Sequence, residues 1–293
     1  MSTKKKIGIQ GVAASFHDVV AHQYFGDNIE TIACASFKTL CEKLVSGEVD
    51  FSVMAIENSL SGSLLTNYRL IQDHHLKIIG ERYLHIQQNL MALPGVKLED
   101  IKVVRSHPIA LRQCGEYLAT HPDWELQEYN DTAECARIIA EEKNTHAAAI
   151  AGLYAAEHYG LNILERGIET HKKNYTRFMI LSTMAEESTD HNKASVSIRL
   201  GHQVGSLAQV LNIFTQHHIN MTKIQSVPVV GQPNEYTFHI DVEWASYPDY
   251  ENAMHQVLKH VSHLSVLGEY KKGNLEQLLN TTNDEARIEH STY

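Results

Sequence analysis

The chain has 293 residues, enough for about two ordinary domains, and its 43% hydrophobic and 20% charged residues are typical of a globular protein with a sizeable core. The formal net charge of −10 argues against a nucleic-acid surface, since phosphate binding needs clustered Lys and Arg. No apolar run approaches the roughly 18 residues of a membrane helix, and none predicts a signal peptide. We therefore expect a cytoplasmic protein without nucleic-acid or membrane partners.

The cysteines and histidines show no pattern that is typical of a metal or redox site. Cys34, Cys41, Cys114 and Cys135 form no CxxC pair, so we expect four free thiols in a reducing compartment. The 19 histidines form short clusters but neither an HExxH motif nor a zinc-finger spacing. We expect no metal site.

Strands and helices alternate through the first part of the chain. Apolar runs predict strands at 7–10, 49–59, 78–81, 101–108, 124–130, 146–152 and 174–182. Apolar residues at helical spacing predict helices at 16–24, 36–46, 63–74, 110–120, 132–143 and 153–160. Such alternation is typical of a mostly parallel sheet with both faces covered, so the first 183 residues are one α/β unit or two α/β lobes.

A different pattern follows the polar segment 184–193, which we interpret as a linker. Strands are predicted at 194–200, 220–230, 234–244 and 263–270, and helices at 205–218 and 247–261. The order βαββαβ is that of a ferredoxin-like α+β domain. The segment from about residue 273 to 293 is polar, and we expect a loose tail.

Polar side chains follow several strands of the first part, where parallel sheets bind their ligands. Asn58 and Ser59 follow one strand, Ser106 and Gln113 follow another, and Thr132 opens a helix after a third. Each has an ordinary alternative: Ser and Thr are preferred helix caps, and Gln113 is equally suited to a helix surface. Together, hydroxyls and free backbone N–H groups at helix starts favour a small polyanionic ligand such as a dicarboxylate.

Thr176 and Arg177 stand directly before the apolar run 178–181. They form either an ordinary strand edge or a site for an oxygen-rich anion. The sequence has no G-x-S-x-G elbow, no Walker loop and no G-x-G-x-x-G after the first strand. Acyl transfer, nucleotide-dependent phosphoryl transfer and a dinucleotide cofactor therefore lose support.

Five stretches resemble the prephenate dehydratase family, in that family's order and approximate spacing. They are "AIENSLSGSL", "SHPIALRQC", "DTAECA", "AAIAGLYAAEHYGL" and "NYTRF". The C-terminal part resembles an ACT regulatory domain, so the resemblance covers nearly the whole chain. It implies a two-lobed, periplasmic-binding-protein-like catalytic domain with its site between the lobes, followed by a ferredoxin-like domain.

The resemblance implies where each domain of the chain begins and ends. The catalytic domain would span residues 1–183, with one lobe from about 7–80 with 160–183 and the other from 84–158. The linker would span 184–193, the ACT domain 194–272 and the tail 273–293. ACT domains pair side by side, which implies a homodimer or homotetramer.

The implied reaction converts prephenate into phenylpyruvate, carbon dioxide and water, and aromatisation drives it without a cofactor. Thr176 would lie at the leaving hydroxyl as a proton donor or hydrogen-bonding group, and Arg177 would pair with a carboxylate through its bidentate fork. Glu57 would hold Asn58 or Arg177, and Phe178 would support the site. The implied substrate-binding residues are Asn58, Ser59, Ser106, Gln113, Thr132 and Arg177.

The effector implied by the ACT resemblance is L-phenylalanine, as a feedback regulator. Two family charges are absent from its pocket, where this chain has Gln225 and Val227. In the catalytic part, Ala14 stands where the family usually has Gly, and Gln87 and Gln88 replace a frequent pair of histidines. The implied effector-binding residues are Gly205, Ser206, Leu207, Asn220 and Met221.

Three alternatives stay open on the sequence. Arogenate dehydratase shares the chemistry, with a substrate that carries an amino group in place of the keto group. A two-lobed ligand-binding sensor without catalysis and a regulatory partner of another enzyme are further alternatives. Thr176 together with Asn58, Ser106 and Gln113 favours the enzyme.

Overall fold

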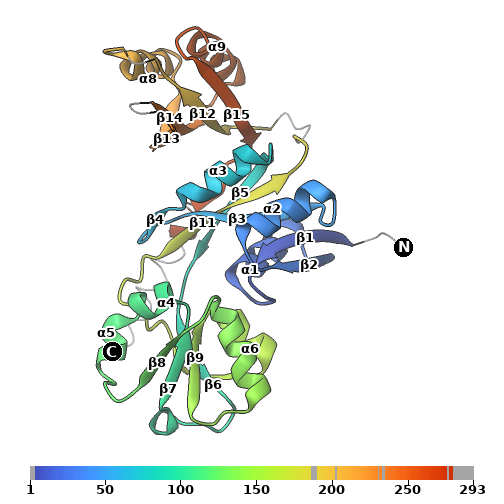
Figure 1. The fold of residues 1–293 in the computed structure, drawn as a ribbon, viewed down its shortest axis with the longest axis vertical. Coiled ribbons are helices and arrows are strands. Elements are labelled where there is room, and N and C mark those ends of the chain that lie inside the picture. The colour runs from blue at the N-terminus through green and yellow to red at the C-terminus, as the bar shows by residue number, and fades with distance from the viewer. Residues whose placement is uncertain are drawn as a thin grey trace. The chain divides into compact units, whose positions relative to one another are not determined.

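The computed structural model describes residues 4–185, 190–201, 203–229, 231–232, 235–275 and 277–279 (Figure 1). Contacts divide them into two units. Of these described residues, the first unit comprises those within 4–64 and 82–178 and those from 275, and the second comprises those within 65–81 and 179–274. None of the described helices is long and apolar enough to cross a membrane.

The first unit begins with an α/β layer whose strands lie in the order β2-β1-β3-β11-β5. The pairs β1–β2 and β1–β3 are parallel, as the alternation of strands and helices predicts. The two-residue strand β4 pairs antiparallel with the end of β3. These elements are β1 (Lys5–Gln10), α1 (Phe16–Phe25), β2 (Ile29–Cys34), α2 (Phe37–Ser46), β3 (Phe51–Asn58), β4 (Gly62–Ser63), β5 (Lys77–His85) and β11 (Tyr175–Ser182).

A second sheet is inserted between β5 and β11, and we call residues 86–169 the inserted lobe. Its strands lie in the order β10-β6-β9-β7-β8, with parallel pairs at β7 and antiparallel pairs at β6. The sheet is therefore mixed. Its elements are β6 (Asn89–Ala92), the 3-10 helix Leu98–Asp100, β7 (Val103–Ser106), α4 (Pro108–Gln113), α5 (Gly115–Ala119), β8 (Glu125–Glu128), α6 (Thr132–Glu142), β9 (Ala147–Ala151), α7 (Leu153–Tyr159) and β10 (Asn162–Glu165).

The chain enters and leaves the inserted lobe at adjacent points. The backbone N–H of Ile86 donates to the carbonyl of Asn174 at 2.7 Å. The ring of His85 stacks on that of Tyr175, with centroids 5.0 Å apart. The two ends of the inserted lobe therefore lie side by side and are joined by these two contacts.

The loop after β1 fastens the first lobe to the inserted lobe. Ala14 packs into the core of the inserted lobe, and Tyr159 donates a hydrogen bond to the carbonyl of Ala13 at 2.9 Å. A methyl group on Gly152 would lie 2.8 Å from the ring of Phe16, so a larger residue there would have to displace this ring. Ala14 has φ +63°, the left-handed conformation that glycine adopts most readily, which accounts for a glycine being usual at this place.

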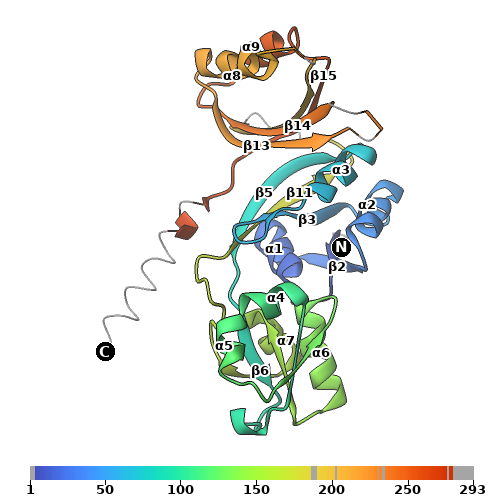
Figure 2. The ribbon, with the colours of Figure 1, turned by 60° about the vertical axis from the view of Figure 1, so that its left-hand side comes forward.

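The second unit contains an antiparallel sheet in the order β13-β14-β12-β15, with α8 and α9 on one face (Figure 2). This confirms the ferredoxin-like βαββαβ prediction. Its core joins both helices to the sheet through residues such as Phe214, Ile240 and Tyr250. The elements are β12 (Lys193–Arg199), α8 (Ser206–Gln216), β13 (Asn220–Pro228), β14 (Tyr236–Glu243), α9 (Tyr247–Val257) and β15 (His263–Tyr270).

The first half of β5 and helix α3 (Leu65–Asp73) also belong to the second unit. Tyr68 of α3 stacks on His239, and Gln72 donates to the hydroxyl of Ser197 at 2.8 Å. A methyl group on Gly268 would lie 2.0 Å from the carbonyl oxygen of Ile78, so β15 approaches β5 as closely as glycine allows.

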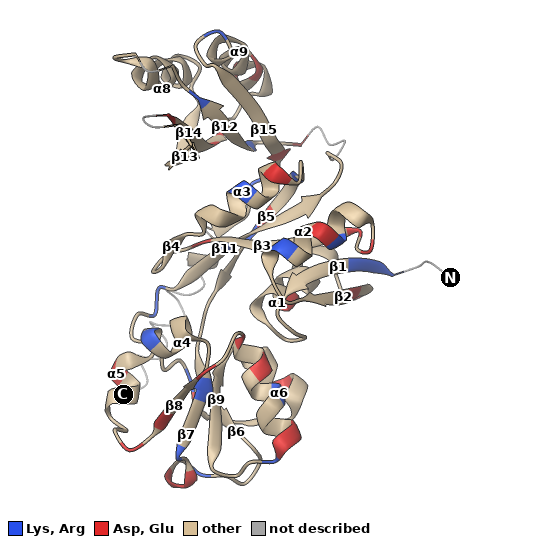
Figure 3. Cartoon of the chain, viewed as in Figure 1, with Lys and Arg blue, Asp and Glu red and all other residues tan. Residues whose placement is uncertain are grey.

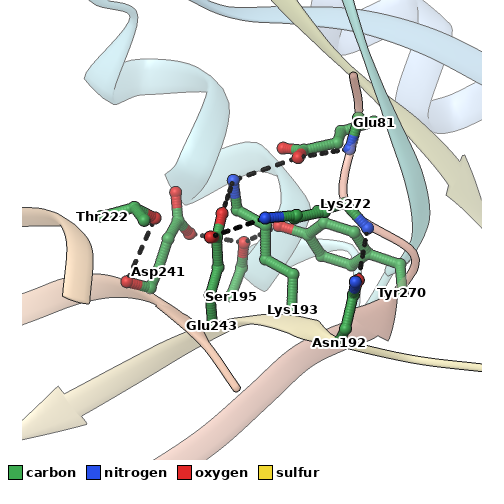
Figure 4. A network of polar contacts seen from close by, with 10 residues as sticks. Glu81, Asn192, Lys193, Ser195, Thr222, Asp241, Glu243, Tyr270 and Lys272 are labelled. Atoms are coloured by element: carbon green, nitrogen blue, oxygen red, sulfur yellow. Dashed lines mark hydrogen bonds and ion pairs between the residues drawn. The ribbon is translucent and has the colours of Figure 1, made fainter. Parts of the chain in front are cut away.

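A buried ionic cluster lies within the second unit (Figure 4). The Lys193 ammonium group is 3.0 Å from Glu81 and 3.1 Å from Glu243, and its side chain is only 4% exposed. Lys272 approaches Glu243 at 3.5 Å. The backbone N–H of Gly273 donates to Glu81 at 2.8 Å. The cluster therefore places one buried ammonium group between two carboxylates, of which Glu243 also has Lys272 nearby.

Charged residues of both signs are interspersed over the elements (Figure 3). On α6, for example, Arg137 pairs with Glu134 and Glu141.

The domain bounds drawn from the sequence remain a prediction, and the structure divides the chain somewhat differently. Residues 162–165 form β10 in the inserted sheet, although the predicted division placed 160–183 with the other lobe. Residues 65–81 cluster with the second unit. Of the predicted linker, residues 186–189 lie outside the described residues, as does most of the predicted tail.

Candidate active site

A cavity of about 320 Å³ lies in the first unit, lined by the first lobe and by the inserted lobe. Aromatic rings of Phe16, Phe37 and Phe178 give it an apolar side. Its polar groups come from the ends of elements and are amides, hydroxyls, histidines and one carboxyl group. They belong to Gln10, His17, Asn58, Ser61, Gln88, His107, Gln113, Asn130, Asp131, Thr132 and Thr176.

The amide of Asn58 is fixed in one orientation at the end of β3. Its Oδ1 accepts from the backbone N–H groups of Leu60 and Ser61 at 3.0 and 2.9 Å. Nδ2 therefore points toward β11, where it donates to Thr176 Oγ1 at 3.0 Å and to Asn174 Oδ1 at 2.7 Å. Because Thr176 accepts this bond, its own hydroxyl hydrogen is left to donate into the cavity.

The same chain of hydrogen bonds orients Gln113. Asn174 is fully buried, and its Nδ2 donates to Gln113 Oε1 at 3.1 Å. Gln113 ends α4 and lines the cavity, so its Nε2 group remains a donor for a ligand. Three segments that are distant in the sequence thus form one network, in which Asn58 donates to Thr176 and to Asn174, and Asn174 donates to Gln113.

His17 of α1 lies in the apolar side of the cavity as a neutral ring. It meets Phe178 edge-on with centroids 5.1 Å apart, and it also contacts Phe37. Burial lowers the pKa of His17 to about 3. Its Nε2 accepts from the backbone N–H of Ala55 at 3.3 Å, which places the proton on Nδ1.

Two further titratable groups line the cavity from the inserted lobe, each at the start of a helix. His107 caps α4, where its Nδ1 accepts from the N–H of Ile109 at 3.2 Å, and burial lowers its pKa. Asp131 caps α6, where its Oδ1 accepts from Glu134 N at 2.9 Å. Burial raises the pKa of Asp131 to about 6, and the backbone N–H groups of the first turn oppose the shift.

The structure brings five of the predicted residues to this cavity: Asn58, Gln113, Thr132, Thr176 and Phe178.

Four other predicted residues lie elsewhere. Ser106 is fully buried and donates to the carbonyl of Ile150 at 2.7 Å, which ties β7 to β9. Ser59 donates to the carbonyl of Lys173 and accepts from Tyr175 N. Glu57 pairs with Ser63 in the β3–β4 ladder and does not line the cavity.

Arg177 is buried, but its guanidinium carbon lies 5.9 Å from the centre of the Tyr83 ring rather than in the cavity wall. Successive side chains of a strand point to opposite faces, so Arg177 faces away from the cavity that Thr176 and Phe178 line.

The prephenate dehydratase family model matches residues 7–186, more than half of the chain. The chain belongs to the prephenate dehydratase family. It is 30% identical over 280 residues to the bifunctional chorismate mutase/prephenate dehydratase of Escherichia coli strain K12. It is 35% identical over 286 residues to arogenate dehydratase 2 of Petunia hybrida. Each alignment covers 92% of this chain and 72% of the relative.

Two solved structures are similar to this family member over most of its length. A prephenate dehydratase from Arthrobacter aurescens, in complex with L-Phe, has a TM-score of 0.80 at 28% identity, covering 91% of this chain and 89% of that one. GqqA, described as a novel type of quorum quenching acylase, has a TM-score of 0.82 at 26% identity, covering 92% and 98%.

The predicted effector residues of this prephenate dehydratase family member lie in the second unit. Ser206 and Leu207 at the start of α8 line a cavity of about 330 Å³ together with Tyr236 and Phe238. Gly205 precedes them with φ +86° as the N-terminal cap of α8. Asn220 and Met221 begin β13 and do not line this cavity.

The predicted site residues do not include Asn174, His17 or Asp131, although Asp131 stands beside Thr132 at the same helix start. Asn174 stands next to the "YTRF" stretch but acts through other side chains, so no ligand chemistry marked it. His17 follows Phe16 on an amphipathic helix and reads as an ordinary helical residue. Asp131 has the sequence signature of a helix cap, which it also is.

Proposed function

We propose that this chain catalyses the decarboxylative dehydration of prephenate or its amino analogue arogenate, which yields phenylpyruvate or phenylalanine. The observation that carries the proposal is the hydrogen-bond network in which Asn58 donates to the Thr176 hydroxyl and to Asn174, which in turn donates to Gln113. The reaction removes a hydroxyl group and a carboxylate from a cyclohexadiene ring. Aromatisation of that ring supplies the driving force.

Thr176 donates its hydrogen bond to the leaving hydroxyl of the substrate. Because Asn58 donates to Thr176 Oγ1, the threonine oxygen is polarised and its hydrogen is directed toward the cavity. A free threonine hydroxyl is a very weak acid, so its role is to stabilise the departing oxygen rather than to transfer a proton completely. The Gln113 Nε2 group, oriented through Asn174, supplies a second donor for a substrate oxygen.

The aromatic side of the cavity suits the loss of carbon dioxide. Phe16, Phe37 and Phe178 offer no hydrogen bonds to a carboxylate that lies against them. An ionised carboxylate that leaves water for such a surface loses solvation, and this loss is relieved as the charge moves into the ring.

The test compares Thr176→Val with a matched surface variant, Thr120→Val, in which an exposed threonine loses the same hydroxyl. Product formation from prephenate and from arogenate is measured with purified protein. Thr176→Val should lower kcat by roughly 10²- to 10⁴-fold at an unchanged melting temperature, since one positioned donor contributes about that much. Near-normal turnover by Thr176→Val would remove Thr176 from the mechanism.

The proposal extends to regulation. L-Phe is bound by the Arthrobacter aurescens protein, and the cavity beside Ser206 and Leu207 is the candidate site for it here. L-phenylalanine should lower turnover as a feedback regulator, with a coupling of about 1 to 3 kcal/mol. Activity and calorimetric titration with L-phenylalanine measure this, and Leu207→Arg should abolish both effects.

Assembly and location complete the proposal. We expect a homodimer or homotetramer, which light scattering on the purified protein would measure. The four cysteines are buried and free, which supports a reducing, cytoplasmic location.

A further inference from the structure

The described side chains that line the active-site cavity include an acidic group but no Lys or Arg. Among its lining residues in the described part of the chain there is no Lys or Arg, and Asp131 is the sole carboxylic acid. His17 and His107 are neutral at pH 7, because burial lowers the pKa of each. The side chains of the cavity therefore contribute one negative charge and no positive charge when Asp131 is ionised.

The carboxyl group of Asp131 lies where the two lobes meet. A methyl group placed on Gly11 of the first lobe would lie 2.5 Å from Asp131 Oδ2, so this oxygen packs against the Gly11 backbone, where no described side chain lies between them. Backbone N–H groups of Glu134 and Ala133 act on the carboxyl group from its own helix. Within the described residues, no Lys or Arg forms an ion pair with it.

Capping of α6 does not require this charge. Asn and Ser cap helices about as well as Asp, and they do so without placing an ionisable group in a cavity. Burial raises the pKa of Asp131 to about 6, which shows that ionisation is disfavoured where it lies. Asp131 lines the cavity, and a cationic group of a ligand beside its carboxyl group would offset that loss of solvation.

The two candidate substrates differ in the group that would meet Asp131. Each carries two carboxylates, which a third carboxylate repels. In arogenate an ammonium group replaces the keto group of prephenate, so its net charge is −1 instead of −2. Charge-assisted hydrogen bonds between an ammonium and a carboxylate are stronger than those between neutral groups.

We propose that Asp131 binds the ammonium group of the substrate and so makes this chain prefer arogenate to prephenate. The assignment rests on the proposed function, because it presumes that the cavity turns over one of these two compounds. It names a residue that determines specificity, while Thr176 acts on the leaving hydroxyl in both substrates.

The decisive variant is Asp131→Asn, which keeps the size and the capping ability of the side chain but removes the charge. The ratio of kcat/KM for arogenate to that for prephenate should exceed about tenfold in the wild-type chain. Asp131→Asn should lower kcat/KM for arogenate by about 10- to 150-fold, the usual range for a hydrogen bond to a charged group. The loss should fall mainly on KM, and kcat/KM for prephenate should stay the same or rise.

The matched control is Asp100→Asn, because Asp100 also accepts a backbone N–H at a helix start, from Lys97 at 2.9 Å, but is exposed and outside the cavity. That variant should leave the ratio unchanged. A purely capping role for Asp131 would lower both substrates' kcat/KM equally or change neither.

A wild-type preference for prephenate, or an unchanged ratio in Asp131→Asn, would overturn the assignment. Absence of turnover with both compounds would instead contradict the proposed function. In that case calorimetric binding of arogenate and prephenate still decides the role of Asp131. Arogenate should bind the wild-type chain more tightly, and Asp131→Asn should remove the difference.

Discussion

Replacing Lys193 by Met should destabilise the second unit severely. Its ammonium group lies 3.0 Å from Glu81 and 3.1 Å from Glu243, and the side chains of Lys193 and Glu81 are 4% and 0% exposed. Met fills similar volume without charge, so the loss is electrostatic. Breaking a buried pair by removing one partner costs about 3 to 5 kcal/mol, because the other charge stays buried without compensation. For a unit of this size, residues 65–81 and 179–274, that corresponds to a melting-temperature decrease of about 13 to 21 °C.

The assay is urea denaturation followed by tryptophan fluorescence in a Trp124→Phe background, where Trp244 reports on the second unit alone. Trp244 is buried and stacks on Tyr250 with centroids 3.8 Å apart, so unfolding changes its surroundings. Lys271→Met is the matched control, because Lys271 pairs with Asp190 at 2.8 Å in an exposed position and should cost at most about 1 kcal/mol. If both variants lost the same small amount of unfolding free energy, the reasoning that burial makes the Lys193 cluster costly to break would be refuted.

Two further predictions concern the first unit. In the folded protein burial lowers the pKa of His17 to about 3, from the ordinary value of 6.5 that applies to the unfolded chain. Below pH 6.5 the unfolded chain therefore takes up a proton that the folded protein does not, so the contribution of His17 to the free energy of unfolding is fully present above pH 6.5 and falls as the pH decreases toward 3. Between pH 7 and pH 4.5 the free energy of unfolding of the wild-type chain should fall by about 2 to 3 kcal/mol more than that of His17→Gln, whose side chain does not titrate. If the urea midpoints of the two proteins changed equally over this range, the assignment of a neutral, buried ring would be contradicted. Ser106→Ala should lower the unfolding free energy by about 1 to 3 kcal/mol, because the hydrogen bond to Ile150 is lost, while KM changes less than about twofold. A large rise in KM at unchanged stability would instead support the sequence-based role of Ser106 in binding substrate.

The elements that the sequence predicts well are those with a buried apolar face. The run Ala147–Ala151 is buried at every position, and the helices at 132–143 and 205–218 show clear helical spacing. The strands β2, β4, β6 and β10 escaped prediction. Strands β2 and β10 lie at the edges of their sheets and are partly exposed, so they lack a continuous apolar run. Strand β6 is buried but has only four residues, and β4 has only two.

The predicted site residues that reach the cavity lie at the ends of elements, as Asn58, Gln113 and Thr132 do. The sequence does not show which face of β11 is turned to the cavity. Thr176 and Arg177 are neighbours on this strand and point to opposite faces, so only Thr176 lines the cavity. The orientation of an amide depends on partners 61 to 118 positions away, as the bonds of Asn174 and Asn58 show. No local pattern encodes such partners.

The adjacent ends of the inserted lobe affect how strand β11 finds β3 while the chain is being synthesised. Asn58 and Thr176 are 118 positions apart, so a ribosome adding about 5 to 20 residues per second exposes the edge of β3 for roughly 6 to 24 s before β11 emerges. An unpaired strand edge is open to aggregation during that interval. If the inserted lobe folds as it emerges, its adjacent ends deliver β11 to β3 and remove most of a loop-closure cost of about 4 kcal/mol. Rapid folding of residues 86–169 is therefore a condition for a high yield of active protein, although most of these residues never touch the substrate.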